Sequence, residues 1–189
     1  MNVLLLGSGA SAIEFQDYAQ FNNYDVRIGC RHYLHDPSWP ELDYIATIGL
    51  RETDFVVEHW PHLKDRIVSS ERECLKYQIP NVLNKMNMYH HWEVVMTKWA
   101  VQLGATHITT IGYDCLWGGI RELECPVWRE RFPIQTHQVN TEFVKTRAYK
   151  MSSGVTTVRR MKPHIVFKHL APKHKELYNS EPQRIRTAV

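Results

Sequence analysis

The chain begins with a short hydrophobic run that is followed by small residues and then by an amphipathic pattern. The run Val3–Leu6 has the length of a buried parallel strand, and a glycine-rich turn follows it. Ser11 and Glu14 have the S-x-x-E spacing of a helix capping box. Apolar residues then recur on one helical face as far as about Gln20. The pattern therefore predicts a strand, a turn and a helix in succession.

The rest of the chain alternates between strand-like and helix-like segments. The clearest helical pattern runs from Met88 to Leu103, between Asn87 as the cap and Gly104 as the stop. Other segments are shorter. Strands are predicted over residues 25–29, 44–48, 66–68, 106–111 and 155–158, and further helices over residues 53–63 and 140–151.

This alternation predicts an α/β fold: a single-domain, Rossmann-like, mostly parallel sheet with helices on both faces. The 189 residues are enough for one such domain and a short extension. With 43% hydrophobic and 23% charged residues, the composition excludes global disorder and a coiled coil. We expect a nucleotide-binding domain over residues 1–158 and a basic C-terminal extension over residues 159–189.

Composition also bears on where the protein works. No apolar run approaches the roughly 18 residues of a membrane span, and the N-terminus lacks the basic region of a signal peptide. The four cysteines include no C-x-x-C pair, which indicates reduced thiols rather than disulfides or a zinc site. We therefore expect a cytoplasmic protein without a membrane span. The oligomeric state is left open.

Positive charge is concentrated in the expected C-terminal extension. Residues 159–189 contain eight Lys or Arg and two Glu, so they carry +6 while the remainder of the chain carries −3. A basic segment of this kind binds nucleic acid, anionic lipid or another acidic partner. An ordinary solvated terminus is the alternative.

The glycine turn has the G-x-G-x-x-A spacing of a nucleotide-binding motif between a strand and a helix. Backbone N–H groups and the helix dipole at such a turn predict phosphate binding by Gly7, Ser8, Gly9, Ala10 and Ser11. A purely structural tight turn is the alternative. NAD is disfavoured because no acidic residue ends the second strand, and although Arg31 suits the 2′-phosphate of NADP, the chain scarcely has room for a dehydrogenase's substrate domain.

Two loop residues are candidates for catalysis. Asp114 follows the strand predicted over residues 106–111, where a carboxylate can orient a sugar hydroxyl, hold a metal or cap the loop. His137 lies just before a predicted helix, and a histidine pKa of about 6.5 suits a general base. The adjacent His90 and His91 lack the i, i+4 spacing of a metal site, so no metal site is predicted.

The order of these motifs resembles that of the compact bacterial sialyltransferases. The shared features are G-S-G-A-S after the first strand, I-G-Y-D after the late strand, and His137 in an H-x-x-N-T context. The resemblance covers about residues 1–172, and it extends to the related Rossmann-like family that includes the archaeal hydroxymethylpterin pyrophosphokinase. It implies that His137 deprotonates the acceptor hydroxyl. Cys30 stands where the sialyltransferases have an asparagine that reads the cytidine. The charge of the leaving phosphate would be met by backbone amides, Arg31, the basic extension or a metal.

The sequence therefore predicts a sialyltransferase-like glycosyltransferase that moves a sugar from a CMP- or NDP-linked donor to an acceptor hydroxyl. Its expected catalytic residues are His137 and Asp114, and its cofactor requirement, Mg²⁺ included, is left open. One alternative is an ATP-dependent pyrophosphokinase in which Asp114 and Glu93 would hold Mg²⁺. Another is a non-catalytic module that binds nucleic acid through the basic extension.

Overall fold

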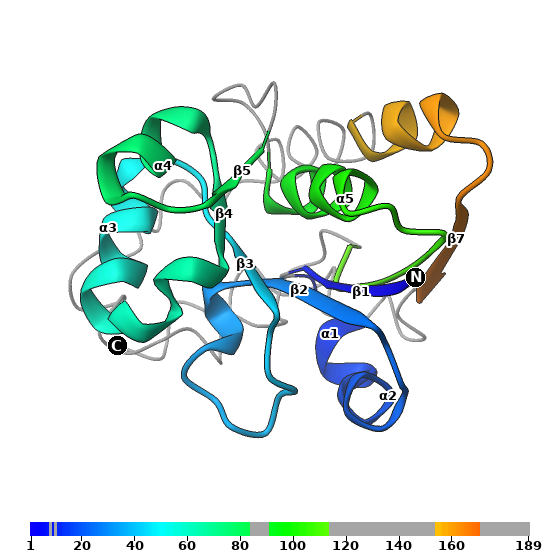
Figure 1. Cartoon of the computed structure of the whole chain (residues 1–189). Coiled ribbons are helices and arrows are strands. Elements are labelled where there is room, and N and C mark those ends of the chain that lie inside the picture. The colour runs from blue at the N-terminus through cyan, green and yellow to red at the C-terminus, as the bar shows by residue number, and fades with distance from the viewer. Residues whose placement is uncertain (8, 10, 84–90, 114–153, 171–189) are drawn as a thin grey trace, which may run out of the picture.

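The structure, a computed structural model, describes residues 1–7, 9, 11–83, 91–113 and 154–170 (Figure 1). The strands are β1 Asn2–Leu6, β2 Val26–Cys30, β3 Tyr44–Ala46, β4 Ile67–Ser69, β5 Asn81–Val82, β6 His107–Ile111 and β7 Val166–Leu170. The α-helices are α1 Ser11–Glu14, α2 Gln16–Phe21, α3 Leu50–His59, α4 Glu71–Tyr77 and α5 Trp92–Gln102, and residues 154–161 are also helical. Two 3-10 helices are η1 Arg31–Tyr33 and η2 Pro61–Arg66.

These strands form one parallel sheet in the order β5-β4-β3-β2-β1-β6-β7. Strand β1 lies between β2 and β6, so the direction in which the chain adds strands reverses at β1. In open α/β sheets, ligands bind outside the carboxyl ends of the strands at such a reversal. The Rossmann-like α/β fold expected from the sequence is confirmed.

The two faces of the sheet carry separate hydrophobic cores. Alternate side chains of β1 point to opposite sides, so Val3 and Leu5 pack under α5 while Leu4 and Leu6 pack against α1 and α2. Figure 1 shows α5 and the helix 154–161 above the sheet and α1 and α2 below it. Strands buried on both faces explain why the β1 sequence is continuously apolar.

The carboxyl ends of the parallel strands meet at one edge of the sheet, which we call the carboxyl edge. The turn after β1, the helix η1 after β2 and the start of α3 after β3 all lie there. Helix α5 leads into β6 and so runs antiparallel to the strands, which puts its N-terminus at the same edge. Any ligand bound in the usual position for this fold would meet these four segments.

The expected strand over residues 155–158 is wrong, because residues 154–161 form a helix. The β-branched residues there favour a strand locally, but packing against the rest of the fold determines the conformation. A Cβ at Gly154 would lie 2.6 Å from a methyl group of Val94 on α5, and Val158 is buried. Close packing on α5 therefore overrides the local preference.

The last described strand is instead β7, which pairs with β6 over its whole length. Sequence analysis missed it because its side chains are mostly exposed and two of them are Lys168 and His169. The sheet-forming part of the chain thus extends to Leu170, beyond the expected boundary after residue 158.

Smaller differences concern the helices. The single helix expected from Ser11 is broken at Phe15 into α1 and α2, and the helix expected over residues 53–63 is α3 followed by η2, which begins at Pro61. Helix α4 and strand β5 were not predicted. The strongest predicted helix is confirmed as α5, but it begins at Trp92 after His91 as the N-cap and not at Met88 after Asn87. The helix predicted over residues 140–151 lies outside the described residues. Within the described segments, no helix is long and apolar enough to span a bilayer.

Candidate functional site

The glycine turn after β1 packs directly against a second turn that follows β6. The Gly7 N–H donates to the carbonyl of Ile111 at 2.8 Å, and the Gly9 N–H donates to the carbonyl of Gly112 at 2.8 Å. In return, the Gly112 N–H donates to Oγ of Ser11 at 2.8 Å. The expected phosphate-binding amides of Gly7 and Gly9 therefore already have backbone partners.

Only glycine fits where these two turns meet. A Cβ at Gly7 would lie 2.5 Å from the carbonyl oxygen of Gly112, and Gly112 itself has a φ of 73°, which side chains rarely adopt. The glycines thus have a structural role, which is what the tight-turn interpretation of the motif predicts. Ser8 and Ala10 lie outside the described residues, so phosphate binding by this turn stays a prediction.

The two candidate donor contacts at the end of β2 are both buried. Cys30 is fully buried, and burial raises the pKa of its thiol to about 12, so the thiol stays protonated at neutral pH. Arg31 is 3% exposed, and its Nε lies 3.3 Å from Oε1 of Glu52. The structure brings Arg31, but not the thiol of Cys30, into a polar network at the carboxyl edge.

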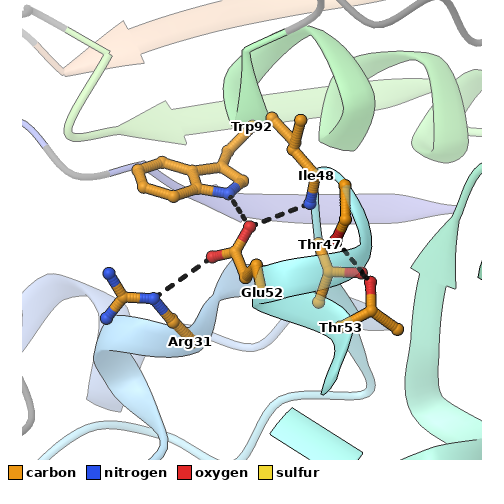
Figure 2. Close-up of polar contacts among 7 residues, drawn as sticks. Arg31, Thr47, Ile48, Glu52, Thr53 and Trp92 are labelled. Atoms are coloured by element: carbon orange, nitrogen blue, oxygen red, sulfur yellow. Dashed lines mark hydrogen bonds and ion pairs between the residues drawn. The ribbon is translucent and has the colours of Figure 1, made fainter. Parts of the chain in front are cut away.

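Glu52 in the first turn of α3 is the centre of that network, which Figure 2 shows. Its Oε2 accepts hydrogen bonds from the indole N–H of Trp92 at 2.7 Å and from the backbone N–H of Ile48 at 2.8 Å. Together with Arg31, these groups form what we call the Glu52 cluster. It joins three segments of the carboxyl edge: η1, the start of α3 and the start of α5.

Burial raises the pKa of Glu52 above its ordinary value, while the Arg31 guanidinium and the two hydrogen bonds oppose that rise. Thr47 and Thr53 pack beside the carboxylate and hydrogen-bond each other at 2.8 Å between their Oγ1 atoms (Figure 2). Both carboxylate oxygens of Glu52 thus have a neighbour: Oε1 lies beside the Arg31 guanidinium, and Oε2 accepts from Trp92 and Ile48. The arrangement can position Arg31 and Trp92 with little freedom of movement.

A second buried carboxylate lies beside this cluster. Glu93, also in the first turn of α5, is 1% exposed, and its backbone carbonyl accepts a hydrogen bond from the Tyr113 hydroxyl at 3.0 Å. Burial raises the Tyr113 pKa well above its ordinary value, so this phenol remains a donor. His32 contacts Trp92 edge to face, with ring centroids 5.3 Å apart. The carboxyl edge therefore combines two carboxylates, a guanidinium and an imidazole.

Sequence analysis missed Glu52 and Trp92 as members of this site. Glu52 could have been found from its position in the first turn of a helix that follows a buried strand, because the first turns of such helices line the carboxyl edge. Its partner Arg31 is 21 positions away, so no local pattern reveals the pair. The expected catalytic residues Asp114 and His137 lie outside the described residues, and the roles assigned to them stay predictions.

The fold and the polar carboxyl edge define the class of the protein as a Rossmann-like α/β protein. The structure is similar to the crystal structure of the sialyltransferase CST-II in complex with a trisaccharide acceptor and CMP, with a TM-score of 0.61. The similarity covers 92% of this chain and 82% of CST-II, at 14% sequence identity.

At this identity the similarity shows a distant sialyltransferase-like fold. It confirms that part of the resemblance seen in the sequence and does not bear on the pyrophosphokinase family. No protein-family model matches the sequence, and no curated protein has significant sequence similarity to it.

Proposed function

We propose that this protein is a glycosyltransferase that moves a sugar from a nucleotide-activated donor to an acceptor hydroxyl at the carboxyl edge of its sheet. The observation that supports the proposal most strongly is the fold similarity, over 92% of the chain, to an enzyme that binds CMP and a trisaccharide. The charged groups gathered at the carboxyl edge, where β2 and β3 end, give independent support, because ligands of such folds bind outside the carboxyl ends of the strands.

In the proposed reaction, His137 takes the proton from the acceptor hydroxyl as its oxygen attacks the anomeric carbon of the donor sugar. The bond from that carbon to the phosphate oxygen breaks, and the nucleotide leaves with the bonding electrons. His137 then releases its proton to solvent. Both His137 and Asp114 take these roles from the sequence resemblance alone.

The described residues contribute to binding and to charge stabilisation. The N-terminus of α5 is the positive end of an 11-residue helix and lies at the carboxyl edge, where it favours a phosphate. Arg31 adds a cation whose position is fixed by the Glu52 cluster. Because Cys30 is buried in the core, the donor base would be read by other groups, and both CMP- and NDP-linked sugars remain in the proposal.

Turnover with mass-spectrometric detection tests the proposal. The protein is incubated with CMP-sialic acid and with UDP- and GDP-sugars, with lactose as the acceptor, with and without Mg²⁺. The expected result is release of one nucleotide together with a glycosylated acceptor. His137→Ala should lower turnover by about 10² to 10⁴ while nucleotide binding is retained, whereas His164→Ala, an exposed histidine outside the site, should leave both unchanged.

Other results would exclude the proposal. Transfer of a pyrophosphoryl group from ATP with a strict Mg²⁺ requirement would indicate the pyrophosphokinase alternative. Absence of turnover with every donor, together with salt-sensitive binding to nucleic acid, would indicate the non-catalytic module. Unchanged turnover in His137→Ala would remove the base assigned here.

A further inference from the structure

A cavity of about 650 Å³ lies on the sheet face that α1 and α2 cover, and no residue of the Glu52 cluster lines it. Its walls are the loop that follows η1, over residues 34–42, and residues 62–66 of η2. In Figure 1 this loop lies below the sheet, between α1 and the teal segment that forms η2. The volume is in the range of small-molecule binding sites.

The cavity is formed without a ligand because its wall is tied down on two sides. On one side, Nη1 of Arg66 donates to the carbonyl of Leu42 at 2.9 Å and pairs with the carboxylate of Glu41. On the other side, the side-chain amide of Gln16 donates to Oγ of Ser38 at 2.7 Å. A preformed wall reduces the conformational entropy that a ligand must offset on binding.

The floor of the cavity is apolar and closely packed. Tyr33 and Trp39 meet edge to face with their ring centroids 4.7 Å apart, and Leu42 lies beside them. Gly29 of β2 allows this packing, because a Cβ there would lie 2.9 Å from a methyl group of Leu42. The floor therefore offers a small hydrocarbon surface at a fixed depth, since each of these three side chains is at most 5% exposed.

The rim carries hydrogen-bonding groups of both kinds. Asp36 accepts a hydrogen bond from the Ser38 N–H at 2.9 Å, and hydrogen bonds from Ser38 hold its pKa below the ordinary value, so it presents a carboxylate. Nε and Nη2 of Arg66 have no partner among the described residues and remain as donors. The imidazole of His62 is exposed and makes no hydrogen bond within the described part of the chain.

We propose that this cavity is a saccharide-binding site that holds one or two sugar units. A sugar ring has C–H surface that suits the apolar floor, and its hydroxyls both donate to carboxylates and accept from Arg66 and His62. The two carboxylates, Asp36 and Glu41, disfavour a nucleotide phosphate. A wholly apolar ligand is disfavoured, because it would displace water from the charged groups of the rim without replacing the hydrogen bonds that the water makes.

This inference goes beyond the proposed transfer reaction and does not require it. No residue of the Glu52 cluster lines the site, although Tyr33 follows Arg31 in η1, and the site would hold part of a glycan that is not reacting. It would therefore operate with or without a bound donor.

Saturation-transfer difference NMR with the full chain tests the site, with galactose, N-acetylglucosamine, N-acetylneuraminic acid and lactose as probes. Methyl phosphate, whose methyl protons are observable, and benzyl alcohol serve as the charged and the apolar controls. We expect saturable binding of at least one saccharide. His62→Ala should weaken that binding about two- to tenfold, the range of one hydrogen bond, and the bulky His62→Trp should abolish it. Because His62 is exposed, both variants should fold, which circular dichroism verifies.

His164→Ala and His164→Trp make the same changes at an exposed histidine outside the cavity and should leave binding unchanged. The proposal is overturned if no saccharide binds by about 10 mM, if both His62 variants bind like the wild type, or if only methyl phosphate or benzyl alcohol binds. Saccharide binding should persist in Arg31→Lys, which keeps a cation beside Glu52 and changes no residue that lines the cavity. A failure to bind nucleotide donors would therefore count against the proposed function without affecting the proposed saccharide site. A failure to bind saccharides in the cavity would count against this site without affecting the proposed function.

Discussion

Replacing Glu52 by alanine should destabilise the fold by about 3 kcal/mol, because it leaves the indole N–H of Trp92 and the backbone N–H of Ile48 unpaired at about 1–3 kcal/mol each. The substitution also leaves the Arg31 guanidinium, which is 3% exposed, without its neighbouring carboxyl group. Glu52→Gln should cost less. Its amide oxygen can still accept from Trp92 and Ile48, and because burial already raises the pKa of Glu52, the fold favours the neutral form of this side chain.

Urea unfolding followed by circular dichroism measures these differences. Thermal unfolding gives the same comparison as a change in Tm: for a chain of this length each kcal/mol lowers Tm by about 2–4 °C, so Glu52→Ala should lower it by about 6–12 °C. The matched control is Glu41→Ala, which removes the carboxylate of the exposed pair with Arg66 and should cost about 1 kcal/mol or less. The double variant Arg31→Met/Glu52→Leu should be more stable than either single variant, because no unpaired charge is left.

The pH dependence of stability provides a second readout for Glu52. Burial raises its pKa in the folded state, so above the unfolded value of 4.5 the folded chain holds its proton more tightly than the unfolded chain. The contribution of Glu52 to stability should therefore fall as pH rises through this window, and Glu52→Gln should remove that fall. If Glu52→Ala costs no more than Glu41→Ala and Glu52→Gln leaves the pH profile unchanged, Glu52 is not the centre of the carboxyl edge.

Three further predictions follow from buried or constrained groups. Gly112→Ala should lower the free energy of unfolding by at least about 2 kcal/mol more than Gly104→Ala. Both glycines have positive φ, but only at Gly112 would a Cβ lie 2.4 Å from the carbonyl oxygen of Gly7. Equal losses of stability in urea unfolding would contradict the close contact of the two turns. Cys30 should resist iodoacetamide in the folded chain and react after unfolding, because burial raises the pKa of its thiol to about 12; peptide mapping that finds native labelling would show that the thiol is accessible. Asp36→Asn should remove stability that is present above pH 3.8 and lost as pH falls through the lowered pKa of Asp36; an unchanged acid-unfolding profile would show that the carboxylate does not stabilise the loop.

The sequence predicts the parts of the fold that depend on local pattern. The buried run of β1, the helix α5 and the strand β6 are recognisable because each buries side chains at the spacing of its own backbone. The helix over residues 154–161 is not recognisable in this way. Its β-branched residues favour a strand, and only packing against α5 makes it helical.

The candidate site, like the fold, has parts that local sequence pattern reveals and parts that depend on long-range contacts. The sequence identifies Arg31 as a charged residue after a strand but does not reveal that Glu52 neutralises it, since this contact depends on the neighbouring positions of β2 and β3 in the sheet. It also identifies the glycine motif without showing that the second glycine turn, at Gly112, uses the amides of Gly7 and Gly9. Long-range pairing therefore decides which predicted residues remain available to a ligand.

The central claim is that the carboxyl edge binds a nucleotide, and a thermal-shift panel of CMP, CDP, UDP, GDP, ADP and ATP, with and without Mg²⁺, tests it most directly. A nucleotide at 100 times its Kd stabilises the fold by about 2.7 kcal/mol, which corresponds to a rise in Tm of about 5–11 °C. We predict such a rise with CMP or with one nucleoside diphosphate, and a clearly smaller rise in Arg31→Gln. An unchanged Tm with every nucleotide would contradict the claim.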